Sequence, residues 1–128
     1  ALAAVQIGYL HCPALGGRRP IQPEVPDDLN AMWRNRSFHN YADYALGSRF
    51  AEALEQVLRL GRDRRLALMC SEAVWWRCHR RIITDHLLLS GHPVDHLLDL
   101  GQITPASPTP GAQPTPDGKA IYPRRPDH

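Results

Sequence analysis

The sequence predicts an α/β domain with a mostly parallel sheet flanked by helices, followed by a Pro-rich C-terminal tail. Short apolar runs typical of strands alternate with stretches whose apolar residues recur at helical spacing, which is the pattern of βαβ units. After Gly101 the composition changes: most of the twelve prolines lie there and the apolar periodicity ends. We therefore expect an α/β domain over residues 1–101 and a Pro-rich tail over residues 102–128.

The first half of the chain is expected to hold one strand and two helices. Residues 7–11 predict the strand, which ends in the loop 13–19, and the proline-containing stretch 20–35 predicts an irregular loop. Ser37 has a side chain suited to the N-cap of the first helix. Apolar residues at helical spacing predict a second helix, from Ser48 to Gly61.

The second half is expected to supply the rest of the sheet. The apolar run over 65–69 predicts a buried strand, residues 77–90 a helix, and residues 94–98 a third strand. Residues 104–117 are expected to be extended or disordered, because they have too little apolar surface to offset their ordering entropy. Residues 120–122 are expected to add a short edge strand.

Composition narrows the class of protein. No stretch approaches the ~18 apolar residues of a membrane span, and no signal peptide is recognisable. Three cysteines, an odd number, favour a reduced cytoplasmic protein over a disulfide framework. The net charge of +2 is too small to indicate nucleic acid by bulk electrostatics. No membrane partner is expected, and cofactor and oligomeric state are left open.

The segment from Cys70 to Arg81 is expected to carry the chemistry, because it brings two thiols, a carboxylate, an imidazole and guanidinium groups to one strand-to-helix junction. In a parallel sheet the loops after each strand share one edge. The loop from Gly16 to Arg19 and the Cys70–Arg81 loop are therefore expected to face the same crevice. The expected ligand-binding residues are Gly16, Gly17, Arg18, Cys78 and Arg80.

The ligand is expected to be a small anion, such as a nucleotide or a phosphorylated metabolite. If the third helix begins near Arg77, its first turns hold several cations at the positive end of the helix dipole. A phosphate or carboxylate would balance them and use the free backbone N–H groups. If the helix begins near Ala73 instead, the same arginines lie on a solvated face.

Three residues are candidates for catalysis. Cys70 could act as a nucleophile, although a cysteine after an apolar strand is also a common buried residue. Glu72 could act as a general acid or base, or pair with one of the arginines, and His79 could carry a proton. A zinc site that uses Cys78 is weakly supported, because no C-x-x-C pair is present and adjacent helical residues point apart. No metal site is predicted.

Two other classes stay open. Trp75 and Trp76, with neighbouring arginines, could stack on bases in a nucleic-acid-associated module, which is the less favoured partner. An aromatic and basic patch around Trp33 and Tyr41 could serve the same purpose. Alternatively, the chain is a non-catalytic, truncated remnant whose cysteines pack and whose arginines form internal ion pairs.

Several of these segments resemble one family. They are Leu15-Gly16-Gly17, Trp33-Arg34-Asn35, Phe38-x-x-Tyr41-Ala42-x-Tyr44, Leu68-Met69-Cys70-x-Glu72, Cys78-His79-Arg80 and Tyr122-Pro123. Together they are similar to the bacterial family called domain of unknown function 488. The resemblance implies a cytoplasmic α/β domain and carries no particular reaction over to this chain. Members of that family usually begin with a strand bearing a Gly-His-Ser-type motif, a helix and a strand ending in Asp-Val-Arg. Nothing before Ala1 supplies them, so we expect the N-terminus of the domain to be incomplete.

Overall fold

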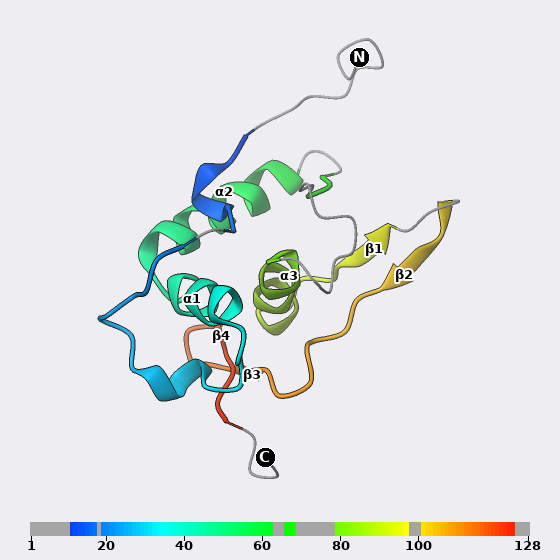
Figure 1. Cartoon of the computed structure of the whole chain (residues 1–128). Helices are drawn as coiled ribbons and strands as arrows, with labels where there is room; N and C mark the ends of the chain where they lie inside the picture. The colour runs from blue at the N-terminus through cyan, green and yellow to red at the C-terminus, as the bar shows by residue number, and fades with distance from the viewer. Residues whose placement is uncertain (1–10, 18, 63–65, 69–78, 98–100, 125–128) are drawn as a thin grey trace.

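A computed structural model of the chain describes residues 11–17, 19–62, 66–68, 79–97 and 101–124. Its helices are α1 (Arg36–Tyr44), α2 (Ser48–Gly61) and α3 (Arg80–Leu89). Its strands are β1 (Asp95–Leu97), β2 (Ile103–Pro105), β3 (Gln113–Pro114) and β4 (Ala120–Ile121). The helices lie close together, and the ribbon of β1 and β2 extends away from them (Figure 1).

The predicted parallel sheet is wrong. The described residues form three α-helices and two separate two-stranded antiparallel sheets, β1 with β2 and β3 with β4. β1 matches the strand predicted over 94–98, but only residues 98–102 connect it to β2. A parallel pair needs a crossover of about a dozen residues or more, so this short connection permits only a hairpin.

The buried strand expected over 65–69 is also corrected where the structure describes it. Residues 66–68 form neither strand nor helix and are exposed, with Leu66 at 45% and Leu68 at 37%. The run lacks the β-branched and aromatic side chains that favour strands, and a short apolar run does not by itself distinguish strand from helix. Of the strand expected over 7–11, only His11 lies within the described residues.

The helix predictions from local pattern are largely confirmed. α2 spans Ser48–Gly61, as its apolar spacing predicts. The cap of α1 is Asn35 rather than the predicted Ser37. The side chain of Asn35 accepts hydrogen bonds from the backbone N–H groups of Ser37 (2.9 Å) and Phe38 (3.3 Å), satisfying two donors at the start of the helix.

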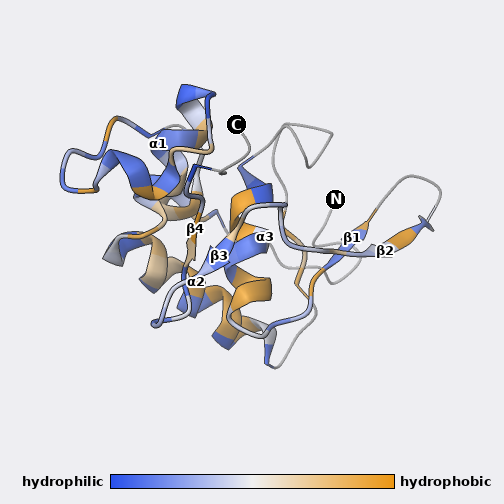
Figure 2. Ribbon diagram, turned by 90° about the horizontal axis from the view of Figure 1, so that it is seen from below, coloured by the Kyte–Doolittle hydropathy of each residue, from blue (hydrophilic) through white to orange (hydrophobic). Residues whose placement is uncertain are grey.

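The core lies where the three helices meet. α1 contributes Tyr41, α2 contributes Phe50 and α3 contributes Ile82, none more than 1% exposed. The ring of Tyr41 meets that of Phe50 edge to face, with centroids 6.0 Å apart. Figure 2 shows the apolar stretches of α2 and α3 within the body of the molecule.

The C-terminal segment closes this core through Tyr122. The backbone N–H of Tyr122 donates to the carbonyl oxygen of Leu29 and to Oδ1 of Asn30, each at 3.0 Å, and its carbonyl accepts from the N–H of Met32 at 3.0 Å. Its hydroxyl donates to Asp85 of α3 at 2.6 Å. The short strand expected over 120–122 is present as β4. The domain boundary after residue 101 stays a prediction, although Tyr122 itself is wholly buried against the helices.

Among the described residues, no helix has the length and apolar character needed to cross a membrane.

Candidate functional site

The structure describes half of the predicted site residues. Gly16, Gly17, His79 and Arg80 lie in the described part. Arg18, Cys70, Glu72 and Cys78 lie outside it, so their predicted roles stay predictions.

Gly17 and His79 are brought into direct contact. A Cβ atom on Gly17 would lie 2.3 Å from Nδ1 of His79, far closer than atoms can approach. Only glycine therefore fits at this position while the imidazole keeps its place. The loop after the short 3₁₀ helix η2 (Pro13–Leu15) thus packs against the residue that precedes α3.

Arg19 fixes the shape of this loop. Its Nε donates to the carbonyl oxygen of Gly16 at 3.1 Å, and its terminal nitrogen donates to the carbonyl oxygen of Pro13. The guanidinium also lies over the ring of Tyr44, 4.0 Å from the centroid. Tyr44 returns a hydrogen bond to the carbonyl oxygen of Ala14 at 2.6 Å. The loop is therefore tied to α1 through Tyr44.

Tyr41 and Asn40 of α1 also hold the backbone of the loop by hydrogen bonds. The hydroxyl of Tyr41 donates to the carbonyl oxygen of Leu15 at 2.9 Å, and its ring lies 5.1 Å from that of His79. The side-chain amide of Asn40 donates to the carbonyl oxygen of Arg19 at 3.3 Å. Consecutive residues of one helix thus support the loop from Leu15 to Arg19.

The start of α3 is basic. His79 occupies the N-cap position, Arg80 and Arg81 follow, and the first turn holds no acidic residue. The helix dipole favours negative charge at this end, so cations here are unfavourable by about 0.3–1 kcal/mol each. The helix begins at Arg80, which is closer to the predicted start near Arg77 than to the alternative near Ala73.

The electrostatics of His79 reflect this crowding. Burial lowers the pKa of His79 most, and the nearby positive charges of Arg80 and Arg19 lower it further. Burial and Arg80 likewise lower the pKa of His96, on β1, against the opposing effect of Asp95. Basic groups from the loop, the helix start and β1 are thus near enough to influence one another.

Sequence reasoning missed Arg19, Asn40 and His96 in this cluster. Arg19 stands next to the predicted Arg18, so the paired arginines were a usable signal. The sequence carries no comparable signal for His96 or Asn40, because their position beside the loop and the helix start depends on how β1 and α1 pack. Arg81 faces another way: it donates to the Thr109 hydroxyl at 3.0 Å and lies 5.3 Å from the ring centroid of Trp33.

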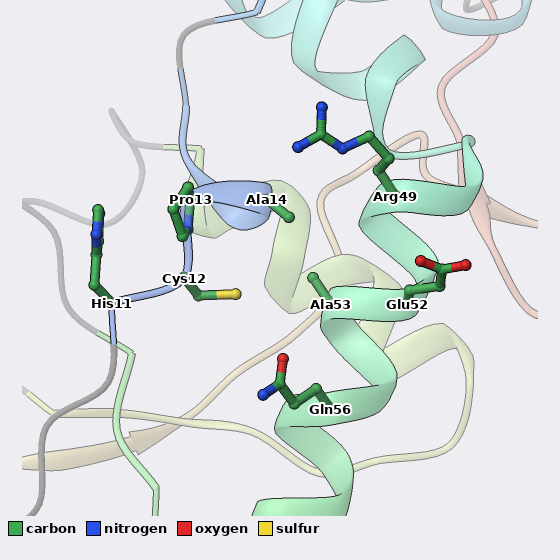
Figure 3. A pocket seen from close by; sticks show the side chains of 8 residues that line it. All are labelled: His11, Cys12, Pro13, Ala14, Arg49, Glu52, Ala53 and Gln56. Atoms are coloured by element: carbon green, nitrogen blue, oxygen red, sulfur yellow. The ribbon is translucent and has the colours of Figure 1, made fainter.

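A separate shallow pocket of about 300 Å³ lies between η2 and α2. Figure 3 shows the Cys12 sulfur directed toward α2, with Arg49, Glu52 and Gln56 along the helix and His11 turned away from the thiol. No predicted site residue in the described part of the chain lines this pocket. Across the described residues, no three histidine, cysteine or acidic side chains are arranged to hold a metal ion.

These features define a small, mainly helical domain in which a glycine loop meets the basic start of a helix. The chain belongs to the family named Domain of unknown function DUF488, whose model matches residues 1–87. That match confirms the resemblance over residues 1–87, which include every residue predicted to be catalytic or ligand-binding. The Tyr122-Pro123 segment of the resemblance lies beyond the match. No curated protein and no solved structure matches the chain.

Proposed function

We propose that this domain binds a small anionic ligand, such as a nucleotide or a phosphorylated metabolite, where the Gly16–Arg19 loop meets the start of α3. The observation that carries the proposal is the contact of Gly17 with His79. The backbone of Gly17 and the imidazole of His79 thus lie at the start of α3, where Arg80 is the first helical residue. Phosphate and carboxylate groups are favoured by this combination of a helix dipole and adjacent cations.

We also propose that residues at this site could catalyse a reaction of the bound ligand. Cys70 as nucleophile and Glu72 as acid or base remain proposals that rest on the sequence. His79 offers a firmer role, because its lowered pKa favours the neutral imidazole at pH 7, a form that can accept or deliver a proton. A cytoplasmic location is proposed only because three cysteines, an odd number, do not suit a disulfide framework.

The first test is a thermal-shift and calorimetric screen of the chain against phosphate, sulfate, nucleotides and sugar phosphates. We expect at least one of these anions to raise the Tm, and Arg80→Ala to weaken its binding roughly 10–100-fold. That loss corresponds to one charge-assisted hydrogen bond of about 1.5–3 kcal/mol. Arg36→Ala is the matched control, because Arg36 is also the first residue of a helix but is exposed and far from the loop in sequence.

Equal weakening by Arg80→Ala and Arg36→Ala would mean that the anion responds only to overall charge. No shift with any anion, in a chain that melts cooperatively, would contradict the proposal. Steeply salt-dependent binding to DNA or RNA without any response to small anions would favour the nucleic-acid alternative instead. The burial of Tyr41 and Tyr44 leaves neither ring free to stack on a base.

Sulfate affinity is expected to rise as the pH falls from 7.5 to 5.5, because a growing fraction of His79 is then protonated and adds a positive charge beside the anion. Burial and the nearby arginines lower the pKa of His79 in the protein, and the negative charge of a bound anion would raise it. We expect an increase of about fivefold between pH 7.5 and 5.5, which corresponds to about 1 kcal/mol of added attraction. Sulfate is used because its own charge is constant in this range.

His79→Gln should remove this pH dependence while leaving some binding through Arg80. A pH dependence that survives in His79→Gln would show that another group, such as His96, is responsible. Isothermal titration calorimetry at each pH provides the measurement.

A further inference from the structure

The pocket between η2 and α2 combines a thiol with charged side chains of both signs. Its volume of about 300 Å³ lies at the lower end of the range for ligand-binding clefts, about 300–1,000 Å³. Gly17, His79 and Arg80 do not line it, so the pocket is separate from the proposed anion site. Its size suits a small ligand.

The thiol of Cys12 faces the interior of this pocket. Cys12 is a free, half-buried cysteine, and its sulfur is directed across the pocket toward α2 (Figure 3). The facing wall holds the small side chain of Ala53, and the ring of His11 is turned away from the sulfur (Figure 3). A molecule that enters the pocket therefore meets the thiol.

The wall formed by α2 offers opposite charges to the same molecule. Arg49 and Glu52 both line the pocket, and their spacing of three residues places them on one side of the helix. Both are exposed, and within the described part of the chain no ion pair joins them. Gln56, one turn further along, adds an amide that can donate or accept a hydrogen bond. The wall thus holds a partner for a carboxylate and a partner for an ammonium group.

We propose that Cys12 is a thiolation site for small disulfides that carry both a carboxylate and an ammonium group, such as the disulfide of an amino acid. Arg49 binds the carboxylate and Glu52 the ammonium group, while the Cys12 thiolate attacks the nearer sulfur. A disulfide forms between Cys12 and one half of the reagent, the S–S bond of the reagent breaks, and the other half leaves as a thiolate. The proton lost by Cys12 passes to solvent, and the reagent is reduced as Cys12 is oxidised.

Three disulfides with the same carbon chain separate the two charges. Cystine carries both groups, cystamine only the ammonium and dithiodipropionate only the carboxylate. Each reacts with the parent chain in buffer and in urea, and mass spectrometry follows the tryptic peptide 1–18, whose single cysteine is Cys12. The rate in urea corrects for the intrinsic reactivity of each reagent. We expect the ratio of the folded to the unfolded rate to be about threefold higher for cystine than for either other disulfide, the effect of one exposed ion pair.

Substitutions on α2 show whether the pocket charges are responsible. Arg49→Gln should lower the ratio for cystine and dithiodipropionate but not for cystamine. Glu52→Gln should lower it for cystine and cystamine but not for dithiodipropionate. Arg59→Gln and Glu55→Gln are the matched controls and should change none of the ratios, because both residues are exposed on the same helix and do not line the pocket.

Equal ratios for the three disulfides in the parent chain would overturn the proposal, as would equal effects of the pocket and control variants. It would also be overturned by a Cys12 that reacts in urea but with none of the three disulfides in the folded chain. Because the readout is confined to the peptide that contains Cys12, reactions at the other cysteines do not affect it.

Discussion

Replacing Asp85 with alanine is expected to lower the free energy of unfolding by about 3–5 kcal/mol, because it leaves two buried donors without an acceptor. Asp85 is 1% exposed, and its carboxyl group accepts from the Tyr122 hydroxyl at 2.6 Å and from the backbone N–H of Thr109 at 2.9 Å. Burial, and then the charge of Asp85, raise the pKa of Tyr122, which keeps the phenol protonated and donating. Urea unfolding at pH 7 measures the loss.

Two further variants show whether the bond to Tyr122 is responsible. Tyr122→Phe should cost about 1–3 kcal/mol, because it removes the hydroxyl and leaves one carboxyl oxygen unpaired. The double variant should lose less than the sum of the single losses, since the two residues are in contact. Asp95→Ala, at an exposed position, should change stability by less than about 0.5 kcal/mol. A loss below about 1 kcal/mol for Asp85→Ala would contradict the buried network.

The hydrogen bond between Asp85 and Tyr122 joins the part of the chain that matches the family model to a part that lies outside the match. Asp85 lies within the segment that the family model matches, whereas Tyr122 lies beyond it. The hydrogen bond and the complete burial of Tyr122 therefore make the C-terminal segment part of the core that holds α3 in place. Because α3 begins at the proposed site, the stability of that site depends on residues outside the family match.

Acid is expected to destabilise the protein through His86, which is 2% exposed. Its ring packs against Phe50, with centroids 5.0 Å apart, and within the described residues its buried Nε2 has no hydrogen-bond partner. Asp117 and Lys119 face it from the segment before β4. Burial, and then the charge of Lys119, lower the pKa of His86 to about 4, against the weaker opposing effect of Asp117.

The folded-state pKa lies below the ordinary value of 6.5, so between these values the unfolded chain binds the proton and the folded chain does not. The contribution of His86 is therefore fully present above pH 6.5 and is lost as the pH falls toward 4. The loss is about 3 kcal/mol by linkage. Urea unfolding at intervals from pH 7.5 to 4.5 should show this decline.

His86→Leu should flatten the decline, because the titrating group is replaced by an apolar one. His79 and His96 have lowered pKa values too, so the difference between the parent and His86→Leu isolates the contribution of His86. His92→Gln, at an exposed position, should leave the pH profile unchanged. A parent and a His86→Leu variant that lose stability in parallel would contradict the account.

Local pattern predicted the helices well and the sheet badly. α2 is fixed by apolar spacing and a terminal glycine within its own segment, so its bounds could be predicted. The sheet depended on pairing between distant segments, and residues 66–68 have neither the side chains nor the burial of a central strand. The alternation of apolar segments in the sequence predicts a parallel sheet. The connection after β1 is too short for a parallel crossover, and β1 pairs with β2 in an antiparallel hairpin instead.

The contact between Gly17 and His79 does not depend on the parallel sheet from which the sequence analysis predicted that their loops would meet. Gly17 does lie against His79, but their contact arises from the packing of η2, α1 and α3 rather than from a shared sheet edge. Arg19 and Asn40 could not be assigned from the sequence, because their hydrogen bonds depend on the path of the loop over α1. The partnership of Asp85 with Tyr122 joins residues far apart in the chain and leaves no local signal.

Anion binding where Gly17 meets the start of α3 can be followed residue by residue in a phosphate titration monitored by amide NMR. We expect saturable shifts of the backbone amide signals of Gly17, His79 and Arg80. The amides of Gly47 and Ser48, at the start of α2, serve as the control, because that helix N-terminus lacks the loop and the histidine. Shifts of equal size at both helix starts, or no saturable shift at Gly17 and Arg80, would contradict anion binding at this site.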